Sequence, residues 1–277
     1  VYLGVGPEQN FTYIAALKPR TVFIIDIRRG NLHTQLMYKA LFELSTDRAD
    51  FVSLLFSRKR PEGLTASSTV QELFAAVGAA PRTEETYKEN YKRIVELLTK
   101  KHSLPLSKED LDGLDYVYGN FYTYGPSISY NSSQGGGGRG NMSTYHSLMT
   151  TTDGAGQARS YLASEALFGV LKDLETKNLV VPLVGDFAGP KAIRAVGKYL
   201  KDQGVTVTAF YLSNVEQYLG QNGVWQSFCN NVASLPLTDT STFIYSQNSG
   251  GGGGGGLSSW YRPMLADVKT YNCTGLP

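Results

Sequence analysis

Glycines and carboxylates follow the short apolar segments of this sequence, in positions where ligands are commonly bound. The first segment ends in a turn that contains Gly4 and Gly6, whose small size lets a ligand approach the backbone and the start of the next helix. The second ends in Asp26, twenty residues beyond Gly6, the usual distance for a carboxylate that accepts the hydroxyl protons of an adenosine ribose. The remaining candidates, each just after a later apolar segment, are Asp186, Asn214 and Glu216.

The segments that must position these residues alternate as in an α/β fold. Residues 1–6 and 21–27 are short and almost continuously apolar, and an amphipathic stretch over 8–17 separates them. Such runs are typical of strands that are buried on both faces of a parallel sheet. Later in the chain we expect helices over 156–177, 190–203 and 224–234 and strands over 179–184, 206–212 and 242–245. In an open parallel sheet ligands bind beyond the carboxyl ends of the strands, which is where the candidate residues lie.

The alternation is interrupted in the middle of the chain. A helix over 32–44 follows the second strand, and further helices are expected over 48–56, 69–77, 83–101 and 108–118 with no strand between them. Ser107, followed three residues later by Asp110, resembles a capping box at the start of the last of these helices. The pattern predicts a doubly wound, mostly parallel, Rossmann-like sheet built from residues 1–46 and 153–277, with a helical insertion over 47–152.

The insertion ends in two segments of unusual composition. Tyrosines recur between residues 116 and 130, where they could line a pocket or, as is more common, pack the insertion against the core. Glycine runs at 135–140 and 250–256 are expected to form mobile surface loops, because glycine loses the most backbone entropy on ordering.

On these residues the chain resembles the Rossmann-like class I methyltransferases that use S-adenosylmethionine. The resemblance covers residues 1–46 and roughly 156–246. It implies that Gly4 and Gly6 form the glycine-rich first loop, that Asp26 holds the cofactor ribose and that Asp186 lies near the adenine. It also implies that Asn214 and Glu216 face the substrate. The string from Gly4 to Tyr13, together with residues 26–31, resembles an uncharacterised bacterial family as well.

The first loop favours S-adenosylmethionine over a dinucleotide. The turn lacks the closing glycine of the dinucleotide fingerprint, and Glu8 stands where a pyrophosphate would be repelled. A cationic sulfonium tolerates Glu8 much better. The expected reaction is in-line methyl transfer to a small or medium-sized acceptor, in which catalysis comes mainly from holding the two reactants in contact. Glu216 or Asn214 would orient the acceptor or accept its proton.

Composition limits the other classes of function. The formal charge of +2 and the absence of a basic stretch argue against nucleic-acid binding. The apolar runs are far shorter than the roughly 20 residues of a membrane span. Scattered histidines and the spacing of Cys229 and Cys273 predict no metal site, and the two cysteines are either bridged or free. The chain begins within an apparent strand, so we expect a preceding piece to be missing, and the compartment stays undetermined.

A second class of function fits the same sequence. The first loop departs from the methyltransferase pattern, and the glycine runs and the tyrosine-rich segment are features of a surface that contacts other molecules. A Rossmann-like fold that has lost catalysis and serves as a binding or self-assembling protein is therefore the alternative, since a fold does not fix a function.

Overall fold

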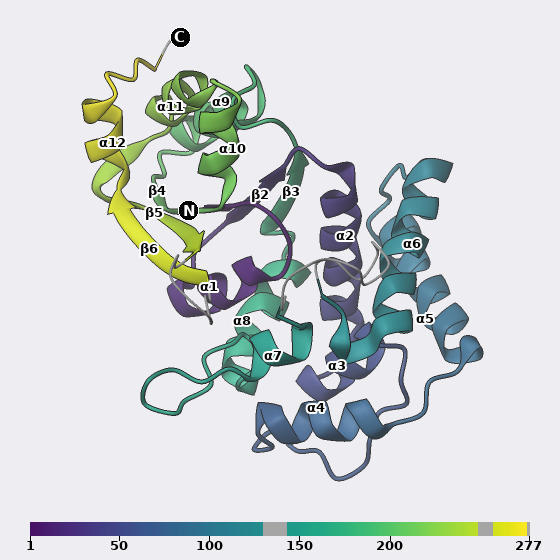
Figure 1. The fold of residues 1–277 in the computed structure, drawn as a ribbon. Helices are drawn as coiled ribbons and strands as arrows, with labels where there is room; N and C mark the ends of the chain where they lie inside the picture. Colours follow the sequence, from purple (N-terminus) through teal and green to yellow (C-terminus); the bar gives the residue numbers. More distant parts are fainter. Residues whose placement is uncertain (130–142, 249–256, 276–277) are drawn as a thin grey trace. The chain divides into compact units, whose positions relative to one another are not determined.

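The computed structural model describes residues 1–129, 143–248 and 257–275, which form two compact units (Figure 1). The sheet unit contains Val1–Asn10, Pro19–Leu32 and Leu179–Pro277, and the helical unit contains Phe11–Lys18 and His33–Asn178. The helical unit is therefore longer than the expected insertion, because residues 33–46 and 153–178 are part of it. The two glycine runs and Tyr130 lie outside the described residues. Within the described ranges, no helix is long and apolar enough to cross a membrane.

The sheet unit is built on one six-stranded sheet with the strand order β3-β2-β1-β4-β5-β6. The strands are β1 (Tyr2–Gly4), β2 (Val22–Asp26), β3 (Val180–Val184), β4 (Val207–Ser213), β5 (Leu237–Asn248) and β6 (Leu257–Pro263). The first five run parallel, and β6 pairs antiparallel with β5. The predicted α/β class and the mostly parallel sheet are confirmed.

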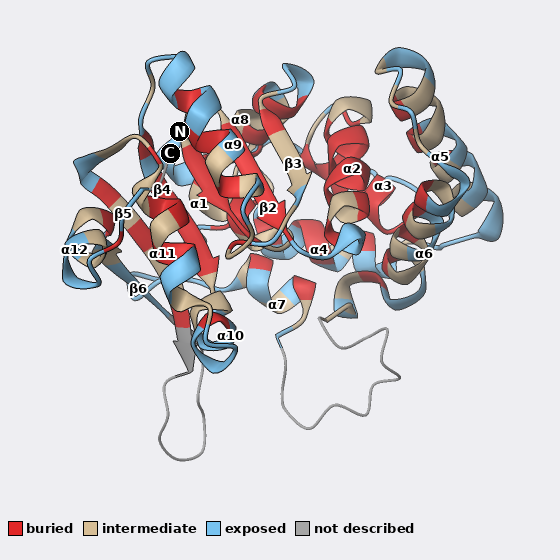
Figure 2. Cartoon of the chain, turned by 90° about the horizontal axis from the view of Figure 1, so that it is seen from above, coloured by how far each residue is buried: buried red, intermediate tan, exposed pale blue. Residues whose placement is uncertain are grey.

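The central strands are buried on both faces, as their apolar runs predict. Tyr2 and Leu3 are successive residues of β1 that point to opposite faces, and both are fully buried. Figure 2 shows the same continuous burial along β2. The sequence did not predict β6, and it predicted only four residues of the twelve in β5. Strand pairing across a glycine run leaves little local signal, because pairing depends on a partner that the pattern does not identify.

Helices of the sheet unit gather on one side of the sheet (Figure 1). They are α9 (Ala192–Asp202), α10 (Val215–Gln221), α11 (Trp225–Ala233) and α12 (Met264–Thr270). Their apolar residues, such as Phe228 of α11, form one core with alternate residues of the strands, among them Leu3, Ile25 and Phe210. A disulfide joins Cys229 of α11 to Cys273, with their Cα atoms 5.5 Å apart. The structure thus decides between the bridged and the free state of this pair.

The helical unit contains most of α1 (Gln9–Leu17) and α2 (Arg29–Leu44), through which the boundary between the units passes. Its other helices are α3 (Arg48–Leu55), α4 (Val70–Ala79), α5 (Glu84–Glu96), α6 (Lys108–Tyr124), α7 (Tyr145–Thr150) and α8 (Glu165–Thr176), with a π-helical turn at Leu97–Lys101. The capping box of α6 is confirmed, since the Ser107 side chain accepts from the Asp110 N–H. The helix predicted over 156–177 begins only at Glu165, because Ser164 caps it there.

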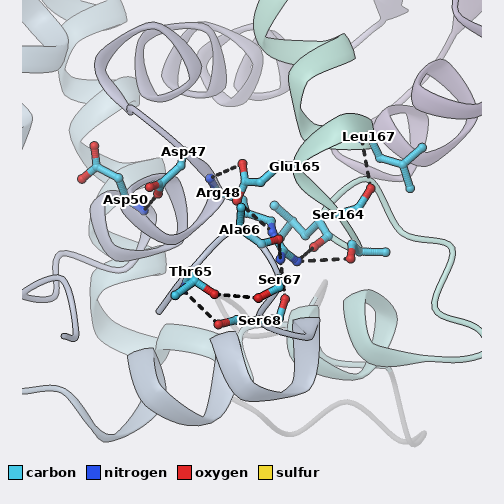
Figure 3. Close-up of polar contacts among 12 residues, drawn as sticks. Asp47, Arg48, Asp50, Thr65, Ala66, Ser67, Ser68, Ser164, Glu165 and Leu167 are labelled. Carbon is cyan, nitrogen blue, oxygen red and sulfur yellow. Dashed lines mark hydrogen bonds and ion pairs between the residues drawn. The ribbon is translucent and has the colours of Figure 1, made fainter. Parts of the chain in front are cut away.

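Arg48 at the start of α3 ties together segments of the helical unit that are far apart in sequence (Figure 3). Its side chain is only 3% exposed and forms an ion pair with Glu165, with Nε 2.9 Å from Oε1. The same guanidinium donates to four backbone carbonyls, which belong to Ala66, Ser68, Leu162 and Ala163. One buried guanidinium therefore supplies hydrogen-bond donors to the carbonyls of two loops and to the Glu165 carboxylate in the first turn of α8.

Tyr118 is the buried tyrosine of the described part of the tyrosine-rich segment, and Phe121 of the same segment is buried as well. Tyr118 is fully buried, and its hydroxyl donates to the Leu54 carbonyl at 2.7 Å and bonds Ser57 at 2.8 Å. Its ring stacks on that of Tyr87 with centroids 5.2 Å apart. Tyr116 and Tyr124 are exposed. The buried part of the cluster is thus a packing element.

Candidate functional site

Four loops follow neighbouring parallel strands at the carboxyl edge of the sheet. The order β3-β2-β1-β4 places the loops after these strands side by side. Asp26 lies opposite Val184 in the register of β2 and β3, and Gly4 lies opposite Ile24 in that of β1 and β2. The predicted site residues therefore lie along one edge of the sheet unit (Figure 1). Five of them end a strand or lie in the loop after it, and Glu216 lies in the first turn of α10.

The loop after β1 is held by a buried asparagine that the sequence analysis did not single out. The Asn10 amide donates to the carbonyls of Val5 at 2.9 Å and Pro7 at 2.8 Å, and its Oδ1 accepts from the Tyr2 hydroxyl at 2.9 Å. A Cβ on Gly4 would lie 1.9 Å from this Oδ1. Gly4 is thus explained by packing, because any side chain there would displace Asn10. The asparagine has no local signature, since its partners are backbone carbonyls.

Gly6 is required by its backbone conformation and is bordered by open space. Its φ is +79°, in the left-handed region that favours glycine. Among the residues that the structure describes, a Cβ built at Gly6 would meet no heavy atom within 4 Å, in contrast to Gly4. The space beside this turn is where a group could approach the backbone of the loop.

Asp26 ends β2 with its carboxylate almost fully buried. The residue is 4% exposed, and its Oδ1 accepts from the Arg28 N–H at 2.8 Å, which closes a tight turn at the strand end. The Arg28 guanidinium lies 3.6 Å from the same oxygen. Both of these contacts are made by Oδ1. The backbone carbonyl of Asp26 accepts from the Gly185 N–H at 2.9 Å, which links its loop to the loop after β3.

Asp186 shapes its own loop and does not cap a helix. Its Oδ1 accepts from the Ala188 N–H at 2.9 Å, and the residue is exposed. Helix α9 begins further on, at Ala192. Asn231 of α11 holds the loop, because its amide donates to the carbonyls of Phe187 at 2.7 Å and Gly189 at 2.8 Å. Two loops of the row are therefore each held rigid by a buried asparagine, a second feature that local sequence does not reveal.

Glu216, the expected proton acceptor, is engaged by an arginine from β6. Arg262 forms a two-pronged ion pair with the Glu216 carboxylate, with Nη1 3.2 Å from Oε2, and also pairs with Asp267 of α12. Burial alone would lower the pKa of Arg262, but the hydrogen bonds that it donates to the carboxylates of Glu216 and Asp267 raise this pKa above its ordinary value. Its guanidinium also lies 4.7 Å from the centre of the Tyr245 ring. Glu216 is therefore paired with a partly buried cation, and the contacts of this cation join α10, β6 and α12.

Asn214 occupies the position before α10 and makes no side-chain cap. The residue before it, Ser213, has φ +52°, a left-handed conformation that is uncommon outside glycine and asparagine. Strained backbone at the end of a central strand is common at ligand sites. Asn214 thus remains the polar side chain after β4 whose amide is not committed to capping its helix.

Metal-ligating residues do not gather in the described ranges. No group of three or more His, Cys, Asp or Glu side chains is arranged to hold a metal ion there. His33, for example, lies 3.0 Å from Asp110 within the helical unit, and a Cβ on Gly113 would overlap its ring. This histidine is therefore a buried hydrogen-bond partner of Asp110, a residue of the capping box of α6.

Comparison with protein families gives one match, which covers most of the chain. Residues 1–252 match a family model described as a domain of unknown function (DUF7790). A search of curated proteins found no relative.

Proposed function

The chain belongs to the DUF7790 family, and we propose that its sheet unit binds S-adenosylmethionine and transfers the methyl group to a small or medium-sized acceptor. The observation that carries the proposal is the pairing of an open turn at Gly6 with the Asp26 carboxylate on the adjacent strand. In this proposal Asp26 holds the ribose hydroxyls and Asp186 lies towards the adenine.

The strand order supports the position of the site. The order β3-β2-β1-β4-β5-β6 is that of Rossmann-like sheets, although the last strand here is antiparallel. In such sheets ligands bind where the direction of winding reverses, which is between β1 and β4. The loops at that point are those of Gly6 and Asn214. A Rossmann-like fold would therefore bring the cofactor to the first loop and the acceptor to Asn214.

The residues fit the proposed cofactor in charge and in space. Oδ2 of Asp26 can accept from a ribose hydroxyl while Oδ1 keeps the Arg28 N–H. The space beside Gly6 admits a group against the backbone. Glu8 follows in the same loop and disfavours a pyrophosphate but not a sulfonium. When bound, the sulfonium supplies an activated methyl group, and the protein contributes binding and orientation.

The acceptor side depends on Asn214 more than on Glu216. The Glu216 carboxylate is occupied by its contact with Arg262, so it can reach an acceptor only when that ion pair opens. The Asn214 amide can donate to or accept from an acceptor and orient it. The proposal therefore favours an acceptor that needs little help with proton removal.

Calorimetric titration of the full chain with S-adenosylmethionine and S-adenosylhomocysteine tests the proposal. Asp26→Asn keeps an oxygen for the Arg28 N–H but removes the charge, and we expect about tenfold weaker binding or more, the usual effect of losing a charged hydrogen bond. Asp239→Asn, an exposed position in β5, is the matched control and should bind like the wild type. Failure of the wild type to bind either ligand, or equal binding by Asp26→Asn, would refute the proposal.

A second candidate is a binding or self-assembling protein without catalysis. Two observations support it. The Glu216 carboxylate is occupied by an ion pair with Arg262, and the Asn10 side chain forms its hydrogen bonds with the first loop of the protein itself. This candidate predicts that neither adenosyl ligand binds and that the chain self-associates in sedimentation experiments. A monomeric chain that binds S-adenosylhomocysteine would contradict it.

A further inference from the structure

Two arginines face each other across a short backbone pairing in the helical unit. Arg58 follows α3 and Arg82 precedes α5, and the two residues form an isolated antiparallel bridge. Residues directly opposite one another in such a pairing carry their side chains on the same side, and like charges in this arrangement repel. The molecule therefore holds two positive charges together at a fixed place.

Each guanidinium is anchored through one nitrogen. Nη1 of Arg58 donates to the carbonyls of Gly78 and Ala80 at the end of α4. Nη1 of Arg82 donates to the carbonyls of Tyr122 at 2.7 Å and Thr123 at 2.6 Å in the last turn of α6. These are favourable contacts for a cation at a helix C-terminus. They fix the two side chains, and within the described ranges no hydrogen bond to protein occupies the other nitrogens of either guanidinium.

The charge of the pair is not neutralised by the protein. Across the described residues, no carboxylate forms an ion pair with Arg58 or Arg82, whereas Arg60 is paired with Asp47. Nε of Arg58 is buried and has no hydrogen-bond partner among the residues that the structure describes. Burial, and after it the charge of Arg82, lower the pKa of the Arg58 guanidinium. A missing partner at this place would be an anion.

The space around the pair suits a small group. A Cβ on Gly125 would lie 3.3 Å from Nη2 of Arg58, so a side chain at this position would crowd the guanidinium. The Arg82 guanidinium lies 5.3 Å from the centre of the Tyr122 ring, which supports one face of the fork and leaves its edge open. Arg82 is exposed and Arg58 is partly exposed, so a ligand can enter from solvent.

We propose that Arg58 and Arg82 bind a phosphate dianion, either free phosphate or the phosphate group of a small monoester. Two guanidinium forks match the tetrahedral oxygens of phosphate in geometry, and two positive charges match its charge of nearly −2 at neutral pH. A carboxylate would neutralise only one of them. The site lies in the helical unit and does not depend on the function proposed for the sheet unit.

Titration calorimetry of the full chain tests this site, with inorganic phosphate and glycerol phosphate as probes at constant ionic strength. We expect Arg82→Gln to weaken the binding of either phosphate probe about tenfold or more, since each charged hydrogen bond is usually worth that factor. Arg58→Gln should show the same loss. Arg159→Gln removes an exposed arginine that is paired with Asp153 in the same unit, and it should bind like the wild type.

Each outcome bears on the site. Tighter binding of glycerol phosphate than of inorganic phosphate identifies a monoester as the ligand, and tighter binding of inorganic phosphate identifies free phosphate. Equal binding shows that the site recognises the phosphate group alone. The proposal is overturned if the wild type binds neither probe, if acetate binds as tightly as phosphate, or if a folded Arg82→Gln variant binds like the wild type. Far-UV circular dichroism shows whether each variant keeps its helices, and the effect of Arg82→Gln decides the case if Arg58→Gln does not fold.

Discussion

Glu175 of α8 is a carboxyl group whose protonation makes the stability of the helical unit depend on pH. The residue is 1% exposed, and its Oε1 has no hydrogen-bond partner among the described residues. Burial raises the pKa of Glu175 from an ordinary 4.5 to about 8, against the opposing charge of Lys39 and with a smaller contribution from Glu43. The carboxyl group is therefore mainly protonated in the folded chain at pH 7.

The sign of the effect follows from proton binding. Between pH 4.5 and about 8 the folded chain keeps this proton and the unfolded chain releases it. Folding then takes up a proton, so the contribution of Glu175 becomes less favourable as the pH rises. The change is about 1.4 kcal/mol per pH unit, which gives about 3 kcal/mol at pH 7 and about 5 kcal/mol above pH 8. Below pH 4.5 both states are protonated and the cost vanishes.

Glu175→Gln keeps the shape of the side chain and removes the titration. We expect the variant to match the wild type near pH 4.5 and to exceed its stability by about 3 kcal/mol at pH 7. Both tryptophans, Trp225 and Trp260, lie in the sheet unit and do not report on the helical unit. Urea unfolding at pH 5, 6, 7 and 8 should therefore be followed by far-UV circular dichroism and by hydrogen exchange of amides in α2 and α8.

Glu89→Gln removes an exposed carboxylate from α5 and is the matched control, with no expected dependence of this size. The reasoning is refuted if Glu175→Gln is less stable than the wild type at pH 7. It is also refuted if the difference between the two does not grow from pH 5 to pH 8. Either result would mean that the carboxylate is ionised in the folded chain and paired with Lys39, whose Nζ lies 2.8 Å from the Glu175 carbonyl and 2.8 Å from Glu43.

Two further predictions concern the links that hold each unit together. Replacing Cys273 by Ser opens a disulfide that spans 44 residues, and the loop-closure relation gives a loss of about 4 kcal/mol in the stability of the sheet unit. Tryptophan-monitored unfolding of the wild type with reducing agent should show the same loss. A variant as stable as the oxidised wild type would contradict this prediction. Arg48→Met leaves Glu165 and four carbonyls without their donor and should lower the free energy of unfolding by about 3–5 kcal/mol. Arg60→Met breaks an exposed ion pair and should lower it by less than about 1 kcal/mol. Equal losses of stability in urea unfolding would argue against the role of Arg48.

Local chemistry determined much of the secondary structure. Apolar, β-branched runs predicted β2 and β3 to within a residue or so at each end, because such runs favour strands. The predicted burial on both faces holds for β2 but not for β3, which is the edge strand and is only partly buried. The start of α6 was predicted correctly because a capping box involves residues three positions apart. Ser164 carries an equally local signal for the start of α8, but the apolar residues before it extended the predicted helix too far.

The sequence also predicted where a site would lie but not how its side chains are engaged. The alternation of strands and helices brought Gly6, Asp26 and Asn214 to one edge of a parallel sheet, since parallel strands end on the same side. The roles of Asn10 and Asn231 depend on carbonyls that come within reach only after the loops have folded. No spacing rule describes such contacts.

Long-range pairing was decided by the tertiary structure alone. Glu216 meets Arg262 across 46 residues, and Cys229 meets Cys273 across 44. Arg58 and Arg82 are brought together by a backbone bridge between two helices. A sequence pattern reports which face of an element is apolar. Which charges and thiols meet depends on how the elements pack, because an ion pair or a disulfide forms only between groups that the complete fold places within a few ångströms of each other.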